Sequence, residues 1–474
     1  MSFARILRSS ALMGGAQVVT LIVAVVRNKV IAQLMGPAGV GLVGVLTAFN
    51  GNVSIMAAWG LGASGVRLIA ASPENEKAAK QAAVRKFGTR LSVIGLIAAL
   101  VLFWPTAQLT FASSEYALEL LLGGLTVPCI VAGSIWSSIL QAGGHVRSLA
   151  RAQILSALGG LIIGLPLIWL FGSIGIAASL LLAAAVPLAF TWLVARRDCL
   201  IVNEPVKAAD MRALFEMGGG LVIIGAAAQF AAYVVRLTII KTHGDDHAAG
   251  LADAGFYQAA IAIAGSLPAL VFGAMGTDFF PRVAAAKDET EARLLSERQI
   301  QAALLLAMPI FVGLVTMGEQ GVALLYADRF APTIPLLTWM IWGVFFRLIG
   351  WPLGYWLVAR GSMRTVIMVE VGSNLAMAAL PLILLPWLGL VGAAIGFFAG
   401  YAIYAIAMLV VVRVRCGRWL DAKTLGWFVA GVAALALAQL FASYYPGPYW
   451  ASLTVGVSTL ISFWAYRRAL SAES

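Results

Sequence analysis

The stretch ALMGGAQVVTLIVAVVRNKVIAQLMGPAGVGLVG, residues 11–44, decides the fold class of this chain. Its first part, residues 11–34, is apolar over more than the roughly 20 residues that a helix needs to cross a bilayer. Pro37 ends that helix, because proline has no backbone N–H to donate. A second long apolar segment begins at once. The stretch therefore predicts two membrane helices joined by a tight turn.

The G-x-G-x-x-G spacing of residues 39–44 also matches a dinucleotide-binding fingerprint. That fingerprint requires a preceding strand and an acidic residue about twenty positions later. The segment before Gly36 has the length of a helix, and no acidic residue precedes Glu74. The glycines therefore indicate close approach of helices rather than a nucleotide site.

The rest of the chain continues this apolar pattern. Of its 474 residues, 61% are hydrophobic and 11% are charged, whereas a soluble domain carries about 25% charged residues. We predict an all-α integral membrane protein with about fourteen transmembrane helices, of which the second, ninth and tenth are long enough to be tilted or kinked. The predicted segments are 11–34, 39–69, 88–110, 117–141, 150–171, 173–195, 213–241, 255–281, 299–325, 333–359, 365–387, 389–413, 424–443 and 449–466.

Lysine and arginine fall on alternate sides of these segments. With the N-terminus in the cytoplasm, 26 of the 32 lie in cytoplasmic segments, two lie on the opposite side and four lie within the spans. Positive residues concentrate in the cytoplasmic loops of membrane proteins, so both termini are expected to face the cytoplasm. The net charge of +11 follows from this topology and gives no reason to expect a nucleic-acid partner.

The second half of the chain repeats the first. Residues from Leu140 onward can be laid without gaps on those from Leu357 onward, at a single offset of 217 positions. Further upstream, Gly39 has a plausible counterpart in Gly255, at an offset of 216. Among the residues that meet at the offset of 217 are Ser156 and Ser373, Gly172 and Gly389, and Gly175 and Gly392.

This repeat predicts the organisation of the chain. Each half holds six spans, so both halves run in the same direction through the membrane, and transporters of this design bind substrate between the repeats. We expect an N-terminal lobe at residues 1–197 and a C-terminal lobe at residues 212–415, around a central cavity. An additional helix pair at residues 424–467 stands outside the repeat.

An ordered series of segments resembles the Wzx-type O-antigen and common-antigen flippases, which belong to the multidrug/oligosaccharidyl-lipid/polysaccharide exporter superfamily. The resemblance covers about the first twelve spans. The two further spans are similar to those of fourteen-span relatives such as lipid II flippases. The segments that carry the resemblance are GPAGVGLVG (36–44), the span of Arg236, AGFYQAAIAIAGSLPALVFGAMGTDFFPRVA (254–284), Asp328-Arg329-Phe330, MVEV (368–371) and GLVGAAIGFFAGYAIY (389–404).

The resemblance implies a function. Flippases of this kind move an undecaprenyl-diphosphate-linked oligosaccharide from the cytoplasmic to the periplasmic leaflet of the bacterial inner membrane by alternating access. The product serves the assembly of O-antigen, lipopolysaccharide or exopolysaccharide. The implied partners are this lipid-linked oligosaccharide and membrane lipid, with a polysaccharide polymerase and a chain-length regulator as candidate protein partners.

Four cations lie within the predicted spans: Arg27, Lys29, Arg236 and Arg347. A cation at mid-bilayer costs about 2.5–3.5 kcal/mol on insertion scales and normally faces a cavity or a partner. Guanidinium groups match the paired oxygens of a diphosphate. We therefore expect the three arginines to hold the diphosphate, with Lys29 as a weaker candidate that snorkels to the interface. The alternative is a structural role in pairs with Glu319, Glu370 or Asp278.

Uncharged polar residues within the spans are candidates for contact with the sugar. These are Asn50, Asn52, Gln229, Tyr233 and Gln258, and the alternative is that they join helices to one another. Glu370 and Asp278 are the candidates for loading a coupling H⁺ or Na⁺ ion, with a local ion pair as the alternative for Asp278. No other cofactor is expected. The His243-Gly-Asp-Asp-His247 segment is interpreted as a solvated turn rather than a metal site.

The sequence contains no motif of an enzyme. It has no Walker sequence, no nucleophile elbow and no metal-ligand spacing. Two other readings stay open. A cation-coupled drug exporter of the same superfamily would favour an acidic cavity, whereas the deep spans here carry arginines. A membrane scaffold without transport activity would tolerate replacement of those arginines.

Overall fold

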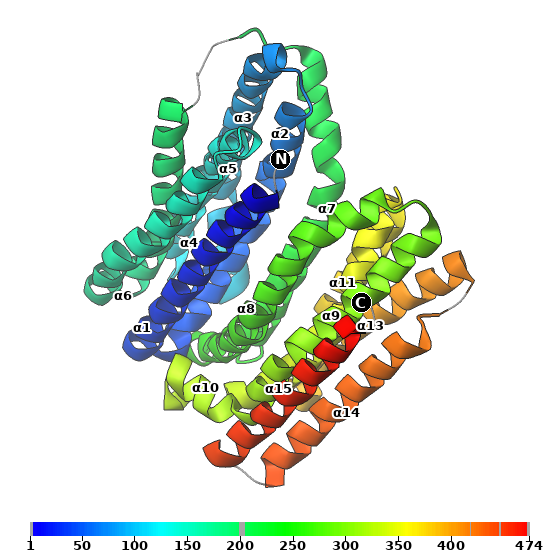
Figure 1. Ribbon diagram of the computed structural model, residues 1–474. Coiled ribbons are helices and arrows are strands. Elements are labelled where there is room, and N and C mark those ends of the chain that lie inside the picture. The colour runs from blue at the N-terminus through cyan, green and yellow to red at the C-terminus, as the bar shows by residue number, and fades with distance from the viewer. Residues whose placement is uncertain (1–2, 199–203, 418, 445–446, 472–474) are drawn as a thin grey trace. The chain divides into compact units, whose positions relative to one another are not determined.

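In the computed structural model, every described element is a helix (Figure 1). The backbone is described for residues 3–198, 204–417, 419–444 and 447–471; within these ranges the side chains of 3–13, 221, 267–278, 280–281, 448–449 and 463–471 lie outside the description. Ten helices of the described part are long and apolar enough to cross a membrane, so the chain is a multi-pass membrane protein. The number of fourteen spans stays a prediction.

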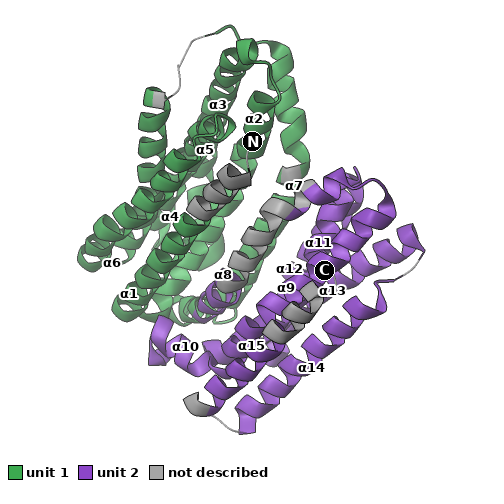
Figure 2. Cartoon of the chain, in the orientation of Figure 1, with its two compact units in different colours: residues 1–255 green, residues 256–474 purple. Residues whose placement is uncertain are grey.

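The chain divides into two compact units, residues 1–255 and 256–474 (Figure 2). Helix α7 packs against α1, α2 and α3, so unit 1 includes it. The predicted lobe boundaries at 197, 212, 415 and 424 stay predictions. Unit 1 contains α1 (Phe3–Ala58), α2 (Leu61–Ala70), η1 (Glu74–Glu76), α3 (Lys77–Phe111), α4 (Ala117–Gly124), α5 (Thr126–Ala142), α6 (Val146–Asp198), α7 (Ala208–Lys241) and the start of α8 (His247–Ala285).

Unit 2 begins within α8. Its remaining helices are α9 (Glu289–Thr316), α10 (Gly318–Leu325), η2 (Asp328–Phe330), α11 (Thr333–Ala359), α12 (Met363–Leu388), α13 (Leu390–Cys416), α14 (Ala422–Tyr444) and α15 (Pro448–Ser471).

Glycine turns join consecutive helices with almost no loop. Within α1 the backbone leaves helical geometry at Gly36, with φ of 68°, and within α6 at Gly172, with φ of 56°. Glycine adopts positive φ without the steric cost of a Cβ atom. Each of these elements is therefore two helices joined at one glycine. For α1, this is the turn that the sequence of residues 11–44 predicts at 36–37. The Met35 side chain reaches Gly172, so the two turns lie at the same end of unit 1.

The repeat recurs as backbone geometry. Gly389, the counterpart of Gly172, has φ of 58° and joins α12 to α13 in the same way. A Cβ atom on Gly175 would meet the Leu167 carbonyl group, and one on Gly392 would meet that of Leu384. Both halves therefore need glycine at the same place, because the helix after the turn packs directly on the backbone of the helix before it.

A reciprocal contact joins α1 to the start of α8. A Cβ atom on Gly41 would collide with the Leu251 carbonyl oxygen, and one on Gly255 would collide with the Pro37 carbonyl oxygen. Gly41 therefore makes the equivalent contact to Gly255, which corrects the pairing of Gly255 with Gly39 that the sequence repeat suggested. Gly39 instead packs against Met35 of its own helix.

Two of the three segments predicted to be tilted or kinked are broken. The second ends α1 at Ala58, and Trp59 and Gly60, both with positive φ, precede α2. The ninth is divided at Met317 into α9 and α10. The tenth is the single helix α11, which contains Pro352 without a break. Two of the segments that are longer than a bilayer requires therefore contain an interruption of the helix.

The outer surface carries large apolar side chains. Trp169 and Trp387, next to the glycine turns, are 72% and 84% exposed, and Trp104 and Trp450 are also exposed. Amphipathic tryptophans near span ends are typical of the membrane interface. The tryptophans of α11 instead pack inside unit 2: Trp356 is fully buried, and the Trp342 indole donates to Gln439 on α14 at 3.1 Å.

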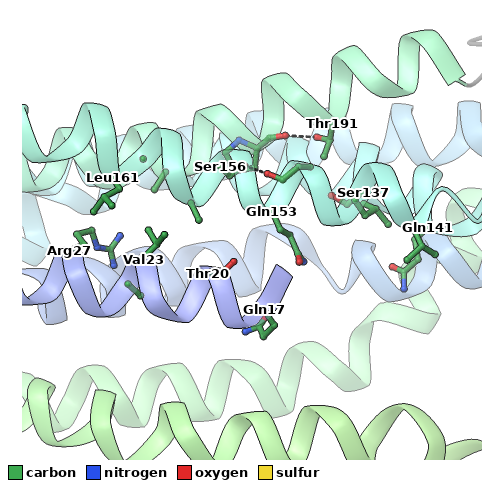
Figure 3. Close-up of a pocket in the computed structure, with 18 residues that line it drawn as sticks. Gln17, Thr20, Val23, Arg27, Ser137, Gln141, Gln153, Ser156, Leu161 and Thr191 are labelled. Atoms are coloured by element: carbon green, nitrogen blue, oxygen red, sulfur yellow. Dashed lines mark hydrogen bonds between the residues drawn. The ribbon is translucent and has the colours of Figure 1, made fainter. Parts of the chain in front are cut away.

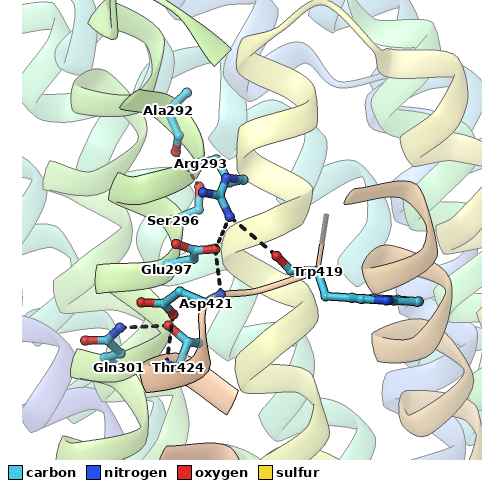
Figure 4. A network of polar contacts seen from close by, with 8 residues as sticks. All are labelled: Ala292, Arg293, Ser296, Glu297, Gln301, Trp419, Asp421 and Thr424. Atoms are coloured by element: carbon cyan, nitrogen blue, oxygen red, sulfur yellow. Dashed lines mark hydrogen bonds and ion pairs between the residues drawn. The ribbon is translucent and has the colours of Figure 1, made fainter. Parts of the chain in front are cut away.

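A paired polar network fixes the start of α14 to α9 (Figure 4). The guanidinium of Arg293 lies 2.6 Å from the Glu297 carboxylate, and their side chains are 8% and 1% exposed. Glu297 also accepts the backbone N–H of Asp421 at 3.2 Å. Asp421 caps α14 by accepting the Thr424 N–H, and the Thr424 hydroxyl accepts from Gln301. Each charge in this network has an opposite charge or a hydrogen-bond donor beside it.

Candidate functional site

Unit 1 contains a cavity of about 530 Å³ between α1, α5 and α6, which we call the Arg27 cavity (Figure 3). Arg27 extends from α1 and Gln153 from α6 into the space between the two helices (Figure 3). Among the described residues that line the cavity, Arg27 is the one charged side chain. Its polar lining consists of Gln17, Thr20, Arg27, Ser137, Gln141, Gln153, Ser156 and Thr191.

Helical periodicity brings this lining together. On α1, Gln17, Thr20, Ala24 and Arg27 follow one another at intervals of three or four residues and so share a face. From residue 17 to residue 27 the helix rises about 15 Å along its axis. Val26 and Ile22 project to the exposed surface of α1 instead. The cavity therefore offers a cation at one end of a row of amide and hydroxyl groups.

A second cavity, of about 780 Å³, adjoins the first and is lined from α1, α2, α5, α6 and α7. We call it the hydroxyl cavity, because its described lining is rich in hydroxyl groups and contains no charged residue. It shares Ser137, Gln141, Ala183, Pro187 and Thr191 with the Arg27 cavity. The polar residues that only the hydroxyl cavity has are Thr47, Asn50, Ser54, Thr126, Cys129, Ser134, Ser138 and Gln229.

The structure thus brings three of the predicted site residues into adjoining cavities: Arg27 in the first, and Asn50 and Gln229 in the second. The amide of Gln229 lies against Gly51, where a Cβ atom would collide with it. The neighbouring Asn52 donates to the Gln229 backbone carbonyl at 2.9 Å, which joins α1 to α7 at this cavity. Asn52 therefore has the helix-joining role that was the alternative to sugar contact.

Three other predicted residues of unit 1 do not line either cavity. Arg236 is 7% exposed, and its Nη1 donates to the Ala232 carbonyl of its own helix at 2.6 Å. The Tyr233 hydroxyl is hydrogen-bonded to Thr110 on α3 at 2.8 Å. Lys29 is half-buried on α1, on a different face from Arg27. Their assignment to substrate binding stays a prediction.

Arg347 and Glu370 lie together in unit 2. Arg347 on α11 is exposed, and its guanidinium lies 5.3 Å from the centre of the Tyr401 ring. Glu370, on α12, lies near Tyr404 and Arg347. The predicted roles of Arg347 and Glu370 stay predictions. Glu319 is exposed on α10.

The remaining acidic and histidine candidates provide no site in the described part of the chain. The side chain of Asp278 lies outside the described residues. The Nε2 atom of His243 lies 2.8 Å from Asp253 Oδ2, next to the turn at residues 242–246. No group of three or more His, Cys, Asp or Glu side chains with metal-binding geometry occurs among the side chains that the structure describes.

The sequence analysis missed most of the uncharged lining. Gln17, Gln141 and Gln153 were not identified, nor were the hydroxyls of α5. A signal was present, because Thr126, Gly133, Ser137 and Gln141 recur at helical spacing on one face of an otherwise apolar span. Serine and threonine are common in membrane helices for packing reasons, so their type alone does not mark a cavity.

The sequence also matches a known family. The profile described as "Polysaccharide biosynthesis protein" covers residues 6–287, which is more than half of the chain. That range includes the Arg27 cavity and the hydroxyl cavity. Among curated proteins, no sequence matches the chain significantly.

Solved transporter structures share the fold. "Lipid II flippase MurJ, inward closed conformation" superposes with a TM-score of 0.73 at 15% identity, covering 97% of this chain and 99% of that one. An inward-facing multidrug resistance MATE family transporter of the MOP superfamily gives 0.59 at 17% identity, covering 85% and 94%. Its outward-facing counterpart gives 0.58 at 18% identity, covering 87% and 95%. The similarity establishes the fold, which this chain shares with these helical membrane transporters.

Proposed function

Because the chain belongs to the polysaccharide biosynthesis protein family, we propose that it is a flippase for a lipid-linked oligosaccharide. The substrate we propose is an undecaprenyl-diphosphate-linked oligosaccharide. The protein moves it by alternating access from the cytoplasmic to the periplasmic leaflet of the bacterial inner membrane, for surface polysaccharide assembly. The termini then face the cytoplasm, in agreement with the distribution of lysine and arginine.

The observation that carries this proposal is the Arg27 cavity. In its described lining, a single guanidinium shares a hollow with amides and hydroxyls and with no carboxylate. Arginine binds two phosphate oxygens at once through its planar fork. The amide and hydroxyl groups suit the sugar that follows the diphosphate, because they both donate and accept hydrogen bonds.

The same observation disfavours a drug exporter. A cavity that selects cationic drugs would carry acidic residues, since opposite charge raises the local concentration of the substrate. Among the described residues, neither the Arg27 cavity nor the hydroxyl cavity is lined by aspartate or glutamate. The MATE transporters share the fold of this chain, so the charge of its own cavity, rather than the fold, is the observation that favours a flippase.

Reconstitution into liposomes tests the proposal. A fluorescent polyprenyl-diphosphate disaccharide, placed in one leaflet, should reach the other leaflet in the presence of the wild-type protein. Arg27→Ala should reduce the rate by about tenfold to a hundredfold, because a charge-assisted hydrogen bond contributes about 1.5–3 kcal/mol. Arg364→Ala, which removes an exposed arginine of α12, is the matched control and should leave the rate unchanged.

Two outcomes would contradict the proposal: no flipping by the wild-type protein, or full flipping by Arg27→Ala at equal abundance. The same liposomes report on ion coupling, for which we propose Glu370 as the loading site. An imposed H⁺ or Na⁺ gradient should change the rate in the wild type and have no effect in Glu370→Gln. A rate that ignores both gradients in the wild type removes that role.

A further inference from the structure

Three side chains that line the hydroxyl cavity hold a buried polar atom without a hydrogen-bond partner. These atoms are Asn50 Oδ1, Ser54 Oγ and Thr126 Oγ1. The residues are 7%, 7% and 2% exposed. A buried polar group without a partner destabilises the folded state, so such groups are rare in folded proteins and call for an explanation. Here all three lie around one hollow.

The neighbouring hydroxyls show a different arrangement. Ser134 and Ser138 donate to the carbonyls of Val131 and Ile135, in the preceding turn of α5, at 2.7 and 2.8 Å. Thr191 donates to the Pro187 carbonyl at 2.7 Å. Their protons are used within their own helices, and their oxygens can still accept. The cavity therefore combines hydroxyls that can donate, at Ser54 and Thr126, with oxygens that can accept.

The lining of the hydroxyl cavity also excludes two classes of ligand. It contains no charged side chain, so an ionic group inside would lose its hydration without gaining an opposite charge. A purely apolar ligand, such as a lipid chain, would leave the three polar atoms unsatisfied. An uncharged group rich in hydroxyls carries no charge that would need an opposite charge, and it can form hydrogen bonds with the three polar atoms. Its hydroxyls then take over the hydrogen bonds that water would otherwise make.

We infer that the hydroxyl cavity binds an uncharged pyranose of the substrate, while Arg27 in the adjoining cavity binds its diphosphate. The inference rests on the proposed function and adds a substrate class to it: the sugars next to the diphosphate are neutral. The shared wall of the two cavities at Ser137, Gln141 and Thr191 is where the phosphate and sugar parts of one ligand meet.

Binding of three synthetic lipids to the purified full-length protein tests this inference. All three share one short polyprenyl chain and a diphosphate: one is bare, one carries a neutral disaccharide and one carries a disaccharide with a uronic acid. The wild type should bind the neutral glycolipid about tenfold more tightly than the bare lipid, which is the effect of one or two net hydrogen bonds. The uronic acid should cancel that gain.

The decisive variant is Ser54→Ala with Thr126→Val. It should lose the tenfold preference for the neutral glycolipid and keep its affinity for the bare lipid. Arg27→Ala should weaken binding of both lipids. Ser64→Ala is the matched control, because Ser64 is equally buried but donates to Gly60 and lines neither cavity; it should bind as the wild type does.

Thermal unfolding separates a binding role from a structural one. Removing hydroxyls that have no partner should leave the unfolding temperature unchanged or raise it, whereas removing hydroxyls that hold the fold together would lower it. A double variant that fails to fold would therefore overturn the inference, and so would one that keeps the preference for the neutral glycolipid.

The outcomes also distinguish the two proposals. If the wild type binds the bare and the neutral lipid equally, the sugar site is wrong and the flippase proposal stands. Tighter binding of the uronic acid lipid than of the neutral lipid would likewise overturn the sugar site and leave the flippase proposal standing. If the wild type binds none of the three lipids, both proposals fail.

Discussion

Arg293 in unit 2 and Arg27 in unit 1 are two arginines of this membrane protein in contrasting polar surroundings. Arg293 lies 2.6 Å from the carboxylate of Glu297, which in turn accepts the backbone of the segment before α14. Arg27 lines a hollow whose other described residues are uncharged. The first network pairs its arginine with a buried carboxylate, and the second places its arginine beside a cavity.

The contrast extends to the uncharged groups. Around Glu297, the hydroxyl of Thr424 accepts from Gln301, and the Thr424 backbone N–H donates to Asp421. Around the hydroxyl cavity, three buried oxygen atoms lack such partners. A polar group that is satisfied by its neighbours contributes to the fold, whereas an unpartnered group on a residue that lines a cavity still has hydrogen-bonding capacity to offer a ligand. The following substitutions test this distinction, beginning with the largest expected effect.

Glu297→Ala should have the largest effect on stability. Removing one partner of a buried ion pair leaves an uncompensated charge and costs about 3–5 kcal/mol. Unfolding of the purified protein in detergent should show this loss, while the flipping rate per folded molecule stays at the wild-type value. The double variant Arg293→Met with Glu297→Leu is the control and should recover most of the stability, because no charge is left buried. A stable Glu297→Ala protein would show that the network does not hold α14 in place.

Gln153→Glu should have an intermediate effect. It adds a carboxylate of nearly the same shape to the Arg27 cavity and so imitates the paired surroundings of Arg293. At an effective dielectric constant of 20 and a separation of about 8 Å, repulsion of the substrate diphosphate amounts to about 2 kcal/mol, or about thirtyfold in affinity.

Binding of the bare polyprenyl diphosphate measures this loss for Gln153→Glu. Its matched control is Gln153→Met, which removes the polar group without adding charge and should change that affinity far less. Equal losses in the two variants would mean that the charge of the cavity is unimportant.

Tyr233→Phe should have the smallest effect. The Tyr233 hydroxyl is satisfied by Thr110 on α3, so it belongs with the paired groups although the sequence placed it in the substrate site. Loss of a hydrogen bond between membrane helices costs about 0.6 kcal/mol on average. A double-mutant cycle with Thr110→Val should give a coupling of that size, with flipping unchanged. A decrease in the flipping rate per folded molecule would instead show that Tyr233 contributes to the substrate site.

The sequence predicted those parts of the fold that depend on local chemistry. Glycine and proline at 36–37 mark a turn whatever surrounds them, since only glycine adopts the backbone angles there. The lengths of segments 39–69 and 299–325 indicated interruptions that the structure has at Trp59–Gly60 and at Met317. Arg27 was identified because a cation within an apolar span is energetically costly and normally faces a cavity or a partner.

Features that depend on distant residues could not be predicted. Glu297 accepts from Asp421, which lies 124 positions later, and the spacing of charges in residues 282–298 does not reveal that contact. Serines and threonines of α5 look alike in the sequence. Which of them bond to their own helix, as Ser134 and Ser138 do, and which do not, as with Thr126, depends on the packing of α1 and α6 around them.

The glycine turns at 36, 172 and 389 have a consequence for how other proteins can recognise this one. Because each turn passes from helix to helix at a single residue, hardly any extended peptide projects from the chain at these points. An antibody, a protease or a cooperating polymerase would find little exposed backbone to bind at these turns. Proteins that associate with this one have more backbone to contact at longer described connections, such as 112–116 and 242–246.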